Sequence, residues 1–149
     1  MRFRVIEEAF NKEDLSVADD GVAANYVFHG PLELRRVEGF KQMVTMMCTA
    51  SPDLHVKIEE MVGEGNKVSY GFLGRGTFKG EFMGIAPTGK EIATREASFI
   101  NIEDGKEVEV WSYTDWLDWY RQLYSIWKRC ERYSLINSVI RMCLSLPFP

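Results

Sequence analysis

The sequence lacks the features that mark a disulfide, metal or membrane protein. Its three cysteines, Cys48, Cys130 and Cys143, are an odd number at wide spacing, so they predict neither a disulfide framework nor a metal-binding knuckle. No run of about eighteen apolar residues is present, so we expect no transmembrane helix. Glu7 and Glu8 precede any long apolar run, which is unlike a signal peptide. We therefore expect a cytoplasmic location.

An excess of positive charge is also missing. The net charge of −4 argues against nucleic acid as a partner. The chain shows no internal repeat and no low-complexity segment. Its 149 residues, 46% hydrophobic and 27% charged, suffice for one globular domain with a core. The abundant aromatic residues can fill that core or line a pocket for a flat apolar ligand.

The first third of the chain predicts helices. A short amphipathic helix near the N-terminus is followed by a weaker one over residues 15–24 and a strong one over 36–50. In the strong helix, Phe40, Met43 and Met47 share one face. Methionines can form an adaptable ligand wall, and plain core packing is the alternative.

From Leu54 onward the hydrophobic period changes to two, which predicts strands. Turn signals separate four of them, from Leu54 to the turn at 63–66, then 68–77, 91–103 and 106–115. Helices segregated from antiparallel strands indicate an α+β fold. Glycines inside 68–77 indicate a strongly curved sheet, which would form a conical cavity beneath the helices.

Simple alternation along the last strand places Trp111, Tyr113 and Asp115 on one face. A carboxylate beyond two large aromatics can be an acid in an apolar pocket, where burial raises its pKa toward a working range. The alternative is that Asp115 caps a final helix over 116–123, because Asp is a favoured N-cap residue.

Other polar residues are candidates for donating a hydrogen bond to an enolate oxygen or for transferring a proton. His29 follows a short apolar run, so it is either a hydrogen-bonded histidine at the edge of the core or a group that points into the cavity. Glu96 and Ser98 share one face of the strand 91–103. Glu96 is then a second acid or a charge at the rim.

The other face of the same strands is apolar. Ala93, Ala97 and Phe99, with Val108 and Val110 on the next strand, would form a surface on the outside of the sheet. Such a surface predicts a homodimer that packs sheet against sheet.

Two segments carry a family resemblance. Residues 80–90, GEFMGIAPTGK, resemble the G-x-F-x-G-I-x-P-T-G-[KR] signature of SnoaL-like polyketide cyclases. Residues 104–115, DGKEVEVWSYTD, resemble the D-G-K-I-V-E-x-W-x-x-x-D segment of that family. With a shorter match at 26–29, the resemblance spans residues 1–124. Residues 125–149 have no counterpart in the family, and we expect them to form a helical C-terminal extension.

The resemblance implies a cone-shaped α+β fold of the nuclear transport factor 2-like, or cystatin-like, type. A curved antiparallel sheet would carry the N-terminal helices over its concave face. Known members close the last ring of aromatic polyketides by an aldol reaction without metal or cofactor. The resemblance assigns general acid/base catalysis to Asp115 and places His29 at a pocket-facing position.

We therefore predict a cofactor-independent enzyme that performs aldol cyclisation or isomerisation on a bulky apolar carbonyl compound, with Asp115 and His29 as catalytic residues. No metal, nucleic acid or membrane span is expected. The alternative is a non-catalytic small-molecule binding protein on the same fold. The predicted substrate wall consists of Trp111, Tyr113, Ser98, Glu96, Phe82, Phe40, Met43 and Met47.

Overall fold

A computed structural model describes residues 4–124 of the chain, so the expected helical extension at 125–149 lies outside the described residues. Its ten helices and strands follow one another in this order: α1 (Arg4–Lys12), α2 (Val17–Gly21), β1 (Val22–His29), β2 (Glu33–Arg35), α3 (Arg36–Ala50), β3 (His55–Glu64), β4 (Lys67–Thr77), β5 (Glu91–Glu103), β6 (Lys106–Thr114) and α4 (Trp116–Tyr124).

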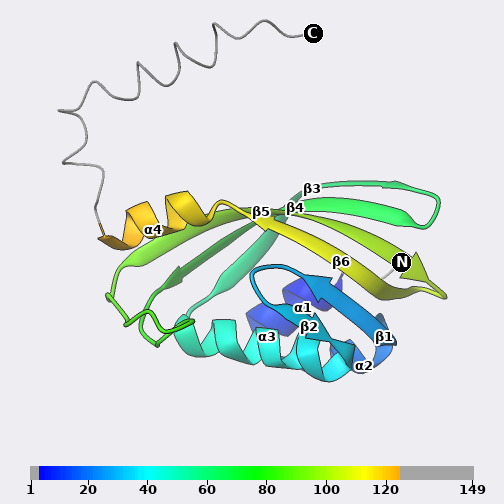
Figure 1. Cartoon of the computed structure of the whole chain (residues 1–149), viewed down its shortest axis with the longest axis horizontal. Coiled ribbons are helices and arrows are strands. Elements are labelled where there is room, and N and C mark those ends of the chain that lie inside the picture. Colours follow the sequence, from blue (N-terminus) through cyan, green and yellow to red (C-terminus); the bar gives the residue numbers. More distant parts are fainter. Residues whose placement is uncertain (1–3, 125–149) are drawn as a thin grey trace, which may run out of the picture.

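The strands form one curled sheet in the order β2-β1-β6-β5-β4-β3. All neighbouring pairs are antiparallel except β1 and β6, which are parallel. Figure 1 shows the sheet arching over α1 and α3, which lie on its concave side. The predicted α+β fold, with N-terminal helices over the concave face of a curved sheet, is confirmed, although the sheet is mixed.

The helix expected over 15–24 is shorter than predicted. The structure has a helix only at Val17–Gly21, and the chain continues as the eight-residue strand β1. Val22, Tyr26 and Phe28 of this strand are buried, and β1 contributes them to the main core. Aromatic and β-branched residues suit a half-buried strand, and pairing with the distant β6 outweighs the local helix pattern.

A β-bulge in β6 decides which side chains face the concave side. Glu109 pairs with Asn101, whereas Glu107 pairs with Ile102, so Val108 is an extra residue on β6. Beyond the bulge, Val110 pairs with the inward-facing Ile100, and both are buried in the core. The sequence pattern had placed Val110 on the outer face, and this bulge is the reason for the difference.

Two hydrophobic clusters hold the domain together. The larger cluster fills the space between the sheet and the helices α1 and α3. The smaller one gathers Phe78 and Phe82 against Trp119 and Leu123 of α4. Gln122 attaches α4 to β5, because its side-chain amide bonds the backbone N–H and carbonyl of Ala93, both at 2.8 Å. Within residues 4–124, no helix is long and apolar enough to span a membrane.

Candidate active site

A cavity of ≈ 130 Å³ lies between the concave face of the sheet and the helices α1 and α3. Most of its wall is aromatic or aliphatic, including the methionines Met43, Met46 and Met47 of α3. Leu32 and Met83 also line it and are 42% and 45% exposed, so the cavity reaches the protein surface beside them. An engineered cavity of about 150 Å³ accommodates benzene, so this volume suits a group of about one aromatic ring.

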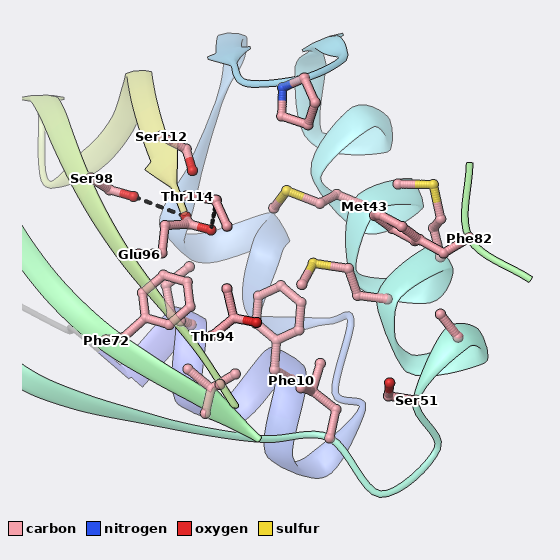
Figure 2. Close-up of a pocket in the computed structure, with 18 of the residues that line it drawn as sticks. Phe10, Met43, Ser51, Phe72, Phe82, Thr94, Glu96, Ser98, Ser112 and Thr114 are labelled. Carbon is pink, nitrogen blue, oxygen red and sulfur yellow. Dashed lines mark hydrogen bonds between the residues drawn. The ribbon is translucent and has the colours of Figure 1, made fainter. Parts of the chain in front are cut away.

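Two carboxyl groups lie on the described part of this wall, and Glu96 of β5 is the one that accepts hydrogen bonds from neighbouring hydroxyl groups. The Ser98 hydroxyl donates to its Oε1 at 3.2 Å, and the Thr114 hydroxyl donates to its Oε2 at 2.8 Å. Figure 2 shows both hydrogen bonds, with Ser112 beside them. Antiparallel pairing produces this arrangement, because Glu96 stands opposite Thr114 and Ser98 stands opposite Ser112.

The surroundings of Glu96 act on its acidity in opposite directions. Removal from water raises the pKa of Glu96 above its ordinary value, because burial disfavours the charged form. Hydrogen bonds from Ser112, Thr114 and Ser98 stabilise the carboxylate and lower this pKa. The net result is a raised pKa on a carboxylate that keeps its hydrogen-bond donors, which suits a base that accepts a proton from carbon.

Glu107 of β6 is a second carboxyl group on the cavity wall. It lies on the hairpin side of the bulge and pairs with Ile102, which packs against the core, so its side chain lies on the same side of the sheet as Val110. Its Oε2 atom is buried and has no hydrogen-bond partner within residues 4–124. Burial raises the pKa of Glu107 from its ordinary 4.5 to about 7.

Two buried tyrosines, Tyr26 of β1 and Tyr70 of β4, complete the polar part of the cavity. Burial raises the pKa of each phenol well above its ordinary value, and the nearby Glu107 and Glu96 raise it further. Both phenols therefore remain neutral. The described cavity wall contains no Lys, Arg or His side chain, so neither carboxyl group has a cationic partner there.

Five residues of the predicted substrate wall do line this cavity, namely Ser98, Glu96, Phe82, Met43 and Met47. Phe40 lies deeper. Its side chain is fully buried in the core and packs edge-on against Tyr26, with ring centroids 6.1 Å apart. It supports the wall without being part of it.

The structure places Trp111, Tyr113 and Asp115 away from the cavity. Trp111 and Tyr113 lie on the outer face of the sheet, where Tyr113 is 62% exposed. Asp115 is exposed and caps α4, since its Oδ1 accepts a hydrogen bond from the backbone N–H of Asp118 at 2.9 Å. This is the alternative that the sequence left open for Asp115.

His29 also lies on the outer face. Its ring stacks on Trp111 with centroids 5.1 Å apart, and its Nε2 lies 3.0 Å from Oε1 of Glu109. The Asn101 amide donates to the other oxygen of Glu109 at 3.3 Å. This network fixes His29 at the edge of the core, pointing away from the cavity.

The bulge also explains why sequence reasoning missed some cavity residues. From the pair Glu103–Lys106, a regular hairpin would place Trp111 opposite Ser98, whereas the structure pairs Ser98 with Ser112. One extra residue therefore exchanges the inner and outer faces of β6. The bulge accounts for two missed polar residues, Ser112 and Thr114. Glu107, Tyr26 and Tyr70 also line the cavity, and the bulge does not change the face on which they lie.

The fold and the largely apolar cavity define a nuclear transport factor 2-like α+β protein. The profile of the SnoaL-like polyketide cyclases matches residues 1–123, and the chain belongs to this family. No curated protein sequence matches the chain. Among the described residues, no group of three or more His, Cys, Asp or Glu side chains is placed to hold a metal ion.

Several solved structures share the fold. TsrD from Streptomyces laurentii is 25% identical, with a TM-score of 0.76 over 81% of this chain and 90% of its own. IdmH from Streptomyces antibioticus, a proposed polyketide cyclase, is 28% identical, with a TM-score of 0.68 over 79% and 92%. AclR from Streptomyces galilaeus, a proposed hydroxylase, is 24% identical, with a TM-score of 0.68 over 79% and 89%. The same fold therefore occurs in proteins described as a cyclase and as a hydroxylase, so the fold alone does not define the reaction, and the residues of the site must.

Proposed function

We propose that the protein is a cofactor-independent acid/base enzyme of the polyketide cyclase type, with Glu96 as the base. Its substrate would be an apolar carbonyl compound that undergoes aldol cyclisation or isomerisation. The observation that carries this proposal is the position of Glu96, a hydroxyl-bonded carboxylate on the wall of an apolar cavity. Because burial raises its pKa, Glu96 is a stronger base than an exposed glutamate.

The reaction requires little more than proton movement. The Glu96 carboxylate takes a proton from the carbon next to the substrate carbonyl, and the electron pair of that C–H bond forms an enolate. In a cyclisation, the enolate carbon attacks a second carbonyl carbon and forms the new C–C bond. The alkoxide so produced takes the proton back from Glu96, which restores the carboxylate. In an isomerisation, Glu96 returns the proton to another carbon of the enolate.

The cavity limits how a substrate can bind. A space of ≈ 130 Å³ holds about one ring, so a larger compound would extend past Leu32 and Met83 at the surface. We infer that only the reacting end of a bulky substrate enters the cavity. The flexible methionines of α3 give that end an adaptable wall.

Sequence resemblance instead assigns the acid/base role to Asp115, with His29 at a pocket-facing position as a second catalytic residue, and that assignment stays a prediction. Two observations favour Glu96 over Asp115. Glu96 lines the cavity, whereas Asp115 is exposed, and the Asp115 side chain is engaged in capping α4. His29 is engaged with Trp111 and Glu109 on the other side of the sheet.

Proton exchange on a small ketone tests the proposed function. Phenylacetone has one ring and acidic hydrogens beside its carbonyl, so the wild-type protein should speed deuterium uptake from D₂O at that carbon, followed by NMR. Glu96→Gln should lower this rate by about 10²- to 10⁴-fold, the usual contribution of a positioned base. Glu109→Gln removes a carboxylate from the outer face of β6 and is the matched control.

A wild-type rate no faster than buffer would contradict the enzyme and favour the second candidate, a non-catalytic binding protein. The apolar wall is the observation that favours that candidate. Native mass spectrometry of freshly purified protein would then show a retained apolar ligand. An equal rate in wild type and Glu96→Gln would show that the base lies elsewhere.

A further inference from the structure

Glu107 is a cavity-wall carboxyl group for which the mechanism above has no role. It is held on β6, the strand that also supplies Thr114 to Glu96. Its Oε2 is buried and lacks a hydrogen-bond partner within the described chain. A buried polar atom without a hydrogen-bond partner costs folding free energy. Such an atom on a cavity wall therefore indicates a group that forms its hydrogen bond with a bound ligand.

We propose that Glu107 is held as a neutral carboxylic acid and donates a hydrogen bond to the carbonyl, and then the enolate, oxygen of the ligand. This extends the proposed function, because it adds a second acid to the site of Glu96. Glu107 keeps its proton through the cycle. It stabilises the negative charge that develops on oxygen while Glu96 carries the proton removed from carbon.

The different surroundings of the two carboxyl groups support this division of roles. Hydroxyl groups of Ser98 and Thr114 donate to Glu96, and donors of this kind stabilise the ionised form. Glu107 Oε2 has no such donor among residues 4–124. Two titratable groups in one site with environments that separate their pKa values are typical of an acid and base pair.

The groups around Glu107 also favour its neutral form. The titratable side chains that face the same cavity are Tyr26 of β1, Tyr70 of β4 and Glu96 of β5, none of which is a cation. Both carboxyl groups act on the same two tyrosines, so they lie in one polar region of the cavity. An ionised Glu107 would stand in an apolar site, near an ionised Glu96, without a positive partner.

The site therefore selects a ligand with an oxygen atom that accepts a hydrogen bond from Glu107. 4-Nitrophenol is a suitable probe, since it has a single ring and its phenolate absorbs visible light. We expect the phenolate to bind the wild-type protein. Because 4-nitrophenol itself ionises at about pH 7, its dissociation constant is calculated from the phenolate present at each pH. That constant should rise as the pH rises through about 7, where Glu107 would lose its proton.

Two variants separate hydrogen bonding from shape. Glu107→Gln keeps a donor and should still bind 4-nitrophenolate, without the weakening at high pH. Glu107→Leu has no donor and should bind about 10- to 100-fold more weakly, the usual value of a hydrogen bond to a charged group. Carbon-13 NMR of glutamate-labelled protein, with the Glu107 signal assigned by its loss in Glu107→Gln, should show this carboxyl group titrating near neutral pH.

Two results would overturn the proposal. The first is a Glu107 signal that titrates at the ordinary acidic value, and the second is equal binding of 4-nitrophenolate by wild type and Glu107→Leu. None of these measurements uses turnover. If Glu96→Gln proves fully active while Glu107 behaves as described, the assignment of Glu96 as the base fails and the inference on Glu107 stands.

Discussion

A single buried carboxyl group makes the stability of this domain depend on pH. The pKa of Glu107 is about 7 in the folded protein, against an ordinary value of 4.5. Below pH 4.5 the group is protonated in both the folded and the unfolded chain, so its stabilising contribution is complete. As the pH rises through about 7, the folded state must also release the proton, and that contribution is lost.

We predict that Glu107→Gln removes this loss. Relative to wild type, the variant should gain about 3 kcal/mol in free energy of unfolding between pH 4.5 and pH 8, since each pKa unit corresponds to about 1.4 kcal/mol. Urea denaturation at several pH values measures the gain. Glu60→Gln, which changes an exposed carboxylate on β3, is the control. A constant difference between wild type and Glu107→Gln across this range would contradict the burial of Glu107.

The stability of the helix α4 depends on Asp115, the residue that precedes it. Asp115 accepts a hydrogen bond from the Asp118 N–H, and the Asp115 carbonyl accepts one from the Trp119 N–H at 3.1 Å. The helix in turn places Trp119 beside Phe82 and Phe78, with ring centroids 5.8 and 5.5 Å apart. The cap therefore supports part of the wall near the entrance to the cavity.

We expect Asp115→Ala to lower the free energy of unfolding by about 1 kcal/mol, the usual value of an N-cap. Asp115→Asn should have almost no effect, because Asn caps a helix as well as Asp does. Urea denaturation of the two variants, compared with wild type, gives both values. Equal stability in Asp115→Ala and wild type would show that this hydrogen bond does not hold the helix.

Hydrophobic period and glycine content were enough to predict β3 to β6, the curvature of the sheet and the position of α3, but not β1 and β2. They were not enough for the inside of the site, because a bulge of one residue at Val108 has no clear signal in the sequence. Glu96 and Ser98 lie on β5, which has no extra residue, so both side chains face the cavity as expected. Trp111 and Tyr113 lie beyond the bulge, and the face expected for them differs from the observed one.

At the scale of the whole molecule, the outer face of the sheet exposes large aromatic side chains. Phe99 is 53% and Tyr113 is 62% exposed, and their rings meet edge to face with centroids 6.0 Å apart. Neighbouring exposed aromatics of this kind are typical of interaction surfaces. We propose that a second copy of the chain covers them in a two-fold symmetric homodimer.

Sedimentation at micromolar concentration tests this prediction. The wild-type protein should be a dimer, and Phe99→Glu should be largely monomeric, because it places two carboxylates in an apolar contact. Leu117→Glu is the control, since Leu117 is 61% exposed and belongs to α4, not to the sheet. A monomeric wild type, or a Phe99→Glu variant that still dimerises, would contradict the proposed interface.

The central claim is that the reacting carboxylate lies inside the cavity on β5 and not at the end of β6. The rate of deuterium uptake by phenylacetone in Glu96→Gln, compared with that in Asp115→Asn, tests it most directly. The account predicts a loss of at least about 10²-fold in Glu96→Gln. Asp115→Asn keeps its cap and should stay within about threefold of wild type. The reverse result, an inactive Asp115→Asn beside an active Glu96→Gln, would contradict the claim and assign the chemistry to Asp115.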